Sequence, residues 1–264
     1  MDGNSRAGLR IASRLGYAAR GVVYLLVGGL AVLAALGRGG GTTDTKGALR
    51  TLLETPWGDA LLGVIAAGLL GYAVWRFVQA VWDVDRHGRD AKGLAVRAGL
   101  LVSGVTHAGL AVFAASLALG NGGGGGGGQA EWTATLMRKP WGQWLVALAG
   151  LAVVGAGMAL AVKARKEKYS KYLDPGYASL PWADAVCKLG LYARAVVMAI
   201  VGGFLVVAAW RADPSQAGGM AEAMGFLRGQ AYGRVLFGIV ALGLFAFGVY
   251  GLIQARYRRI RLPE

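Results

Sequence analysis

The sequence contains a single cysteine, Cys187, and only 16% charged residues. One cysteine excludes a disulfide framework within the chain. Soluble domains carry roughly 25% charged residues, so this charge content argues against an ordinary soluble fold. The 55% apolar content excludes intrinsic disorder, and the 45 glycines lack the every-third-residue pattern of collagen. A membrane protein is the remaining expectation for these 264 residues, whose mean hydropathy is +0.48.

Long uncharged runs recur along the chain. With its flanks, each run approaches the roughly 20 residues that cross a hydrocarbon core of about 30 Å as a helix. The first run follows basic residues, as a secretory signal peptide does. Its sequence recurs in the fifth run, so we interpret it as a retained helix. The sequence therefore predicts an all-α integral membrane protein with six transmembrane helices, at residues 21–37, 60–75, 98–130, 140–162, 195–210 and 235–255.

The chain also contains a threefold internal repeat. Residues 15–24 match residues 189–198 at a constant offset of 174, and a weaker copy begins near Gly99. A second element recurs before the even-numbered helices, as Pro-Trp-Gly at 56–58 and 140–142 and as Ala-Tyr-Gly at 231–233. Each unit is thus predicted to be a two-helix hairpin. The predicted units are residues 1–88 with an N-terminal cytoplasmic segment, 89–170, and 171–264 with a basic C-terminal tail.

The even number of helices in each unit fixes how the units insert. All three units enter the membrane in the same direction, so their natural symmetry is a pseudo-threefold axis along the membrane normal. The two terminal segments, together with the 76–97 and 163–194 connectors on the same side, hold 20 of the 28 Lys and Arg. By the positive-inside rule, both termini are expected in the cytoplasm.

The Gly-x-x-x-Arg-Gly motif at 16–21, the Pro-Trp-Gly motifs and the triplicated hairpin resemble the bacterial domain-of-unknown-function family 1206. The resemblance covers about residues 15–257. It implies a multi-pass protein of the bacterial inner membrane and brings no established activity with it.

Two arginines occupy matching places in the first and third units. Arg20 and Arg194 lie near the cytoplasmic ends of uncharged runs, where a long side chain can snorkel to the lipid headgroups. The spacing also permits a polar vestibule, because Arg20 with Tyr24 and Ser103 with His107 are i,i+4 pairs that each share a helix face. Around an axis, these faces would suit an anion or a lipid phosphate. Both interpretations stay open at this stage.

Other chemistry has little support in the sequence. His107 has no His, Cys or carboxylate at helical spacing, so we expect no metal or haem site there. The glycine tract at 122–128 lacks the Lys-Ser/Thr ending of a phosphate-binding loop, so we interpret it as a flexible linker. We find no motif of a hydrolase, a metalloprotease or a paired-carboxylate enzyme. The chain is expected to have no catalytic residue and no cofactor.

Basic runs at 163–168 and 256–261 lie directly cytoplasmic of the fourth and sixth helices. Such runs attract anionic lipid headgroups, which we expect as partners instead of nucleic acid. Two functions remain. The first is a membrane scaffold or accessory subunit that packs against a membrane-protein partner or a second copy. The second is a passive channel or facilitator that carries a small anionic solute along the pseudo-threefold axis.

Overall fold

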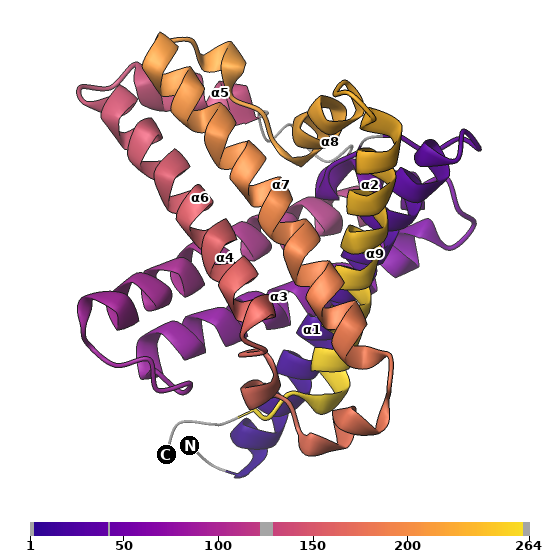
Figure 1. The fold of residues 1–264 in the computed structure, drawn as a ribbon. Coiled ribbons are helices and arrows are strands. Elements are labelled where there is room, and N and C mark those ends of the chain that lie inside the picture. Colours follow the sequence, from indigo (N-terminus) through magenta and orange to yellow (C-terminus); the bar gives the residue numbers. More distant parts are fainter. Residues whose placement is uncertain (1–2, 42, 122–128, 261–264) are drawn as a thin grey trace.

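The computed structural model describes residues 3–41, 43–121 and 129–260, and within these ranges it is built almost entirely of helices (Figure 1). The only β-structure in these ranges is one isolated antiparallel bridge between Leu173 and Arg258. Six helices of the described chain are long and apolar enough to cross a membrane, which confirms the predicted fold class. They are α1 (Gly3–Ala35), α3 (Gly58–Trp82), α4 (Ala91–Ala118), α6 (Gly142–Arg165), α7 (Ala183–Arg211) and α9 (Gly233–Tyr257).

A short helix precedes the second long helix of each repeat. These helices are α2 (Thr45–Leu52), α5 (Gln129–Met137) and α8 (Met220–Arg228). The buried residues of α2 recur on α8 at an offset of 175, with Leu49 matching Met224. Three 3-10 turns complete the described elements, at Ser170–Tyr172, Pro175–Ser179 and Pro214–Gln216. The predicted linker at 122–128 lies outside the described residues.

The glycine of the Pro-Trp-Gly motif closes the turn into each second long helix. A Cβ atom on Gly58 would collide with the backbone carbonyl of Leu52. Gly142 faces the carbonyl of Leu136 in the same way, and Gly233 in the third repeat faces that of Arg228. Only glycine lets the backbone approach this closely, which explains why the motif keeps its glycine where the proline and tryptophan change.

The long helices pack in an order that follows the repeats. In each case the second long helix of one repeat packs on the first long helix of the next: α3 on α4, α6 on α7, and α9 back on α1. Within the first and third repeats, α1 also packs on α3 and α7 on α9. This cyclic pattern is what three units with one orientation around a pseudo-threefold axis produce.

Small residues make the contacts of the first and third repeats equivalent. A Cβ on Gly16 would lie 2.5 Å from the backbone nitrogen of Tyr72, and one on Gly190 would lie 2.5 Å from that of Phe247. Glycine at helix interfaces lets two backbones approach closely within a membrane. The two long helices of the first repeat and the two of the third therefore pack through equivalent close contacts.

The middle repeat departs from this arrangement, because α4 and α6 make no extended contact. Gly99, the counterpart of Gly16, has nothing within 4 Å of its added Cβ. Val102 is 67% exposed, whereas its counterparts Ala19 and Ala193 are 8% and 6% exposed. The middle unit thus has its two predicted long helices, but they do not pack on each other as those of the first and third units do. Val102 is also larger than the alanine at the matching position of the other two repeats.

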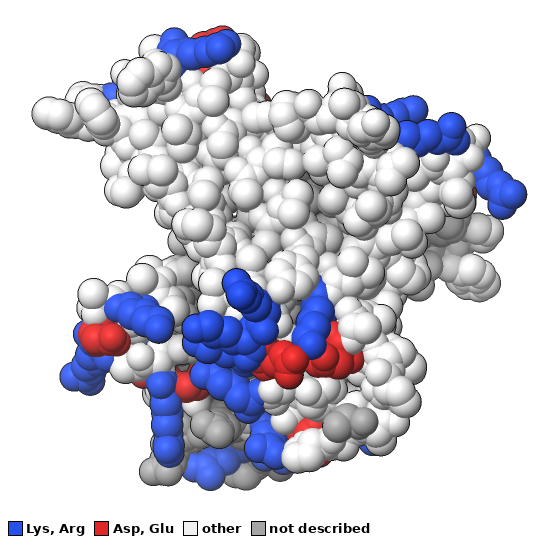
Figure 2. All heavy atoms as spheres, in the orientation of Figure 1, with Lys and Arg blue, Asp and Glu red and all other residues white. Residues whose placement is uncertain are grey.

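The open middle repeat shapes the molecule. The α6–α7 pair and the α3–α4 pair diverge toward one side of the view (Figure 1), and the surface is notched between them (Figure 2). A broad band without charged side chains crosses this face, and most Lys and Arg gather at the end where α1 begins and α9 ends (Figure 2). Exposed tryptophans lie at the ends of the long helices, namely Trp57, Trp82, Trp141, Trp144, Trp182 and Trp210.

Candidate functional site

Arg20 lies inside the helix bundle, and only 8% of it is exposed. Its Nη1 donates to the hydroxyl of Tyr72 at 2.7 Å, and its Nη2 donates to Oε1 of Gln254 at 2.8 Å. Helix α1 begins at Gly3, so Arg20 stands more than four turns from the start of the helix. The snorkelling interpretation is therefore wrong for Arg20, whose side chain is held by α3 and α9.

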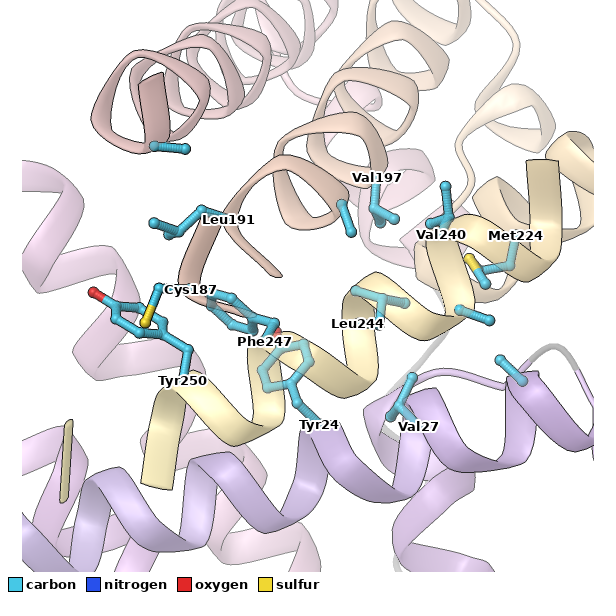
Figure 3. Close-up of a cluster of buried hydrophobic side chains, with 14 of the residues drawn as sticks. Tyr24, Val27, Cys187, Leu191, Val197, Met224, Val240, Leu244, Phe247 and Tyr250 are labelled. Atoms are coloured by element: carbon cyan, nitrogen blue, oxygen red, sulfur yellow. The ribbon is translucent and has the colours of Figure 1, made fainter. Parts of the chain in front are cut away.

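Aromatic rings join the two repeated arginines. The Arg20 guanidinium lies 5.0 Å from the ring centre of Phe247, and that of Arg194 lies 6.0 Å from the same ring. Arg194 also stacks on Tyr24, at 5.1 Å. Tyr24 and Phe247 meet edge to face at 4.8 Å, as the close-up shows (Figure 3). Arg20, Tyr24 and Arg194 thus share one interior cluster.

The middle repeat reaches this cluster through His107. The imidazole lies 4.6 Å from the ring of Tyr72, which is the ring that Arg20 contacts. Its Nδ1 pairs with the backbone carbonyl of Ser103 at 2.8 Å, which orients the ring along α4. The structure therefore brings all five residues of the predicted vestibule into one connected group. Among the described residues, no group of three His, Cys, Asp or Glu could hold a metal ion.

A second set of polar residues extends the site toward the basic end and was missed in the sequence. Arg76 donates to the hydroxyl of Tyr72 and, at 2.9 Å, to Oε1 of Gln79. Gln79 in turn donates to the carboxylate of Asp85. The only sequence signal for these residues is their position at the edge of an apolar run, which predicts a solvated helix end instead of a buried network.

Arg258 completes the network from the end of the chain. Its Nη2 binds Oδ2 of Asp85 at 2.9 Å, and its guanidinium lies between the rings of Tyr17 and Tyr172, at 5.2 and 5.0 Å. Burial disfavours the charge of this guanidinium, but the neighbouring Tyr17 and Asp85 outweigh it and raise the pKa of Arg258 above its usual value. Arg258 therefore stays charged inside the protein.

The network of Arg20, Arg76 and Arg258 holds more positive than negative charge. Its hydrogen bonds include one carboxylate, that of Asp85. The Nε atom of each of these arginines is buried without a hydrogen-bond partner. Buried guanidinium groups bind anions through paired hydrogen bonds and do not give up their protons near neutral pH. The arrangement is thus suited to holding negative charge and not to transferring protons.

Comparisons with known proteins agree with the repeat. The family Domain of Unknown Function (DUF1206) matches residues 15–83, 98–167 and 189–258. The "Uncharacterized protein YxxB" of Bacillus subtilis (strain 168) is 33% identical over 253 residues, which cover 94% of this chain and 90% of that protein. No solved structure matches the chain. With three matches that together span most of its length, the chain belongs to the DUF1206 family.

Proposed function

We propose that this protein is a non-enzymatic membrane scaffold or accessory subunit, and that a transmembrane helix of a partner protein packs between α4 and α6. The observation that carries the proposal is the open middle repeat. Positions that are packed in the first and third repeats are unpacked there, as Gly99 shows against Gly16 and Gly190. A helix inserted at this place would give the middle repeat the contacts that its neighbours already have.

The helix surfaces that border the opening suit such an insertion. Gly99 and Gly109 on α4, and Gly155 on α6, have nothing within 4 Å of an added Cβ. Surface glycines within a membrane favour close helix–helix packing. Val102 and Val105, which are 67% and 63% exposed, add apolar surface beside them. The combination matches a helix interface better than a face that meets only lipid tails.

Photo-crosslinking in membranes of the native host tests the proposal. A photoreactive amino acid at Val102 should yield a discrete crosslinked protein band. The matched control is Val64, which is 72% exposed and belongs to α3 instead of the two helices that border the opening; a probe there should label lipid alone. A band that is absent at Val102, or equally strong at both positions, would count against the scaffold. A band of twice the protein's own mass would identify the partner as a second copy.

One observation favours the alternative, a passive channel or facilitator for a small anionic solute. Arg20 and Arg194 both lie against Phe247 in the interior, as an anion pathway along the axis would require. The interior beside Arg20 is filled, however, by Tyr17, Tyr72 and Trp75, none of which is exposed. Anion flux into liposomes that rises with Phe247→Ala would support the channel, and flux equal to that of protein-free liposomes would support the scaffold.

The proposed location is the inner membrane of a bacterium, with both termini in the cytoplasm. The 20 of 28 Lys and Arg on the side of the termini support this orientation. The charged end in Figure 2 is the end at which α1 begins and α9 ends.

A further inference from the structure

A cavity of about 440 Å³ lies at the basic end of the molecule, where three distant parts of the chain meet. Its walls come from the first turns of α1, the loop at 174–176, and the last residues of α9 with the tail at 258–260. Pockets for small molecules typically measure about 300 to 1,000 Å³. The cavity is therefore large enough for a small anion or for the headgroup of a lipid.

The charge of the cavity is strongly one-sided. Five arginines and a single carboxylate line it: Arg10, Arg14, Arg256, Arg258, Arg259 and Asp174. Among the described residues, the only one of these arginines in an ion pair is Arg258, which binds Asp85. The side chains of Arg10 and Arg259 are exposed, and neither side chain makes a hydrogen bond or ring contact within that part of the chain. The lining thus presents guanidinium groups whose donors are available to a ligand.

Backbone pairing holds the tail in place beside α1. The backbone nitrogen of Asp174 donates to the carbonyl of Tyr257 at 2.7 Å, and that of Arg259 donates to the carbonyl of Tyr172 at 2.9 Å. Arg258, only 6% exposed, anchors the wall between these two bonds, and its buried Nε has no partner. The backbone of the tail and the side chain of Arg258 are therefore held in place before any ligand arrives, which lowers the entropic cost of binding.

The length of α1 places the cavity at the membrane surface. Its 33 residues span about 50 Å at 1.5 Å per residue, against a hydrocarbon core of about 30 Å. Arg10 and Arg14 lie in the first half of this helix, before the uncharged run that begins at Gly21. The cavity consequently opens at headgroup depth, where both a lipid phosphate and a dissolved phosphate can reach it.

We propose that this cavity is a binding site for a phosphate-bearing anion. Guanidinium groups pair with phosphate oxygens through two parallel hydrogen bonds, and this geometry favours phosphate over a single-point anion such as chloride. The proposal concerns a different place from the opening between α4 and α6 and does not depend on the scaffold. Two sources offer the same chemistry: the headgroup of an anionic phospholipid and a free polyphosphate.

The test uses the full-length protein in nanodiscs of phosphatidylcholine, to which phosphatidylglycerol is added for the lipid measurement. Inorganic pyrophosphate titrated by calorimetry probes a free source, and retention of phosphatidylglycerol in native mass spectrometry probes a lipid source. The double variant Arg10→Gln/Arg259→Gln should weaken binding at least tenfold, since hydrogen bonds to charged groups contribute about 1.5 to 3 kcal/mol each and 1.4 kcal/mol is tenfold. The matched control is Arg86→Gln/Arg89→Gln, two exposed arginines in the connector between α3 and α4, which should bind within about twofold of the unchanged protein.

A third variant separates pairing geometry from charge. Arg10→Lys/Arg259→Lys keeps the charge but cannot form two-point pairs, so its binding should fall between those of the two double variants above. It also serves as the test if the glutamine variant does not fold. Saturable binding of pyrophosphate alone identifies a soluble ligand, and retention of phosphatidylglycerol alone identifies a lipid headgroup. The proposal is overturned if neither probe binds saturably, or if both lining variants bind as tightly as the control.

Discussion

Nη2 of Arg20 donates to Oε1 of Gln254 at 2.8 Å and thereby joins the first long helix to the last across 234 residues of chain. Both side chains are buried, with exposures of 8% and 3%. The bond joins the last repeat to the first, because α1 belongs to the first repeat and α9 to the third. A buried polar pair at this place favours the packing of α1 on α9 over other pairings of the apolar helices.

The first prediction concerns this pair. Gln254→Leu should lower the free energy of unfolding by about 1 to 3 kcal/mol, because it leaves a buried donor of Arg20 without a partner. Arg20→Met/Gln254→Leu should recover most of that loss, since replacing both partners with apolar groups leaves none unsatisfied. Unfolding by SDS titration in detergent measures both. If the double variant loses as much stability as Gln254→Leu alone, or more, the bond does not couple the two residues.

The second prediction uses one glycine position in three repeats. Gly16→Ala and Gly190→Ala should each destabilise the protein by about 1 to 3 kcal/mol, because the added methyl group meets the backbone of a neighbouring helix at 2.5 Å. Gly99→Ala should be neutral or stabilising, since nothing lies within 4 Å of its Cβ and alanine favours helix by about 1 kcal/mol. The same SDS titration measures all three. A loss at Gly99 equal to the other two would contradict the open middle repeat.

Much of this fold could be predicted from the sequence, because hydropathy and repetition are local signals. The six spans follow from uncharged runs, and the common orientation of the repeats follows from an even number of helices. The sequence of the middle repeat also differs from the other two at positions that pack closely in them. Val102 stands where the other repeats have Ala19 and Ala193, and Ala152 stands where they have Gly68 and Gly243. The sequence alone does not show which helices touch, so these larger residues could not be related to helix packing before the structure was known.

The network beyond the vestibule could not be predicted in the same way. Arg76 and Gln79 lie at the end of an apolar run, where polar residues usually face water, and nothing local distinguishes a buried pair from a solvated one. Asp85 and Arg258 are 173 residues apart, and their pairing depends on where the tail runs after α9. The position of Arg20 along its helix was also misjudged from the sequence. Arg20 stands at the edge of the uncharged run that begins at residue 21, but α1 begins well before that run, at Gly3.

The third prediction separates the ring of Tyr24 from its hydroxyl. Arg194 stacks on this ring at 5.1 Å, so Tyr24→Phe should change stability by less than about 0.5 kcal/mol because the ring remains. Tyr24→Leu should cost at least about 1 kcal/mol more than Tyr24→Phe, because it loses both the cation–π contact with Arg194 and the edge-to-face contact with Phe247. In an Arg194→Met background that difference should fall by about 0.5 to 1 kcal/mol, the contribution of the cation–π contact. An unchanged difference there would show that the ring stabilises the protein through its other contacts alone.

The last prediction concerns orientation, which rests on the distribution of positive charge. Ser215 and Ser179 are exposed and lie on the two opposite connecting sides of the bundle. In intact cells, Ser215→Cys should react with a membrane-impermeant thiol reagent, and Ser179→Cys should react only after the membrane is opened. The native Cys187 has no exposed surface, so the unchanged protein should stay unlabelled and serve as the control.

Reversed labelling would place both termini outside and overturn the positive-inside argument. It would also place the arginine-lined cavity on the outer face, where phosphate would have to come from the outer leaflet or the medium. Six spans would remain under either result, because they depend on hydropathy and length and not on which side carries the charge.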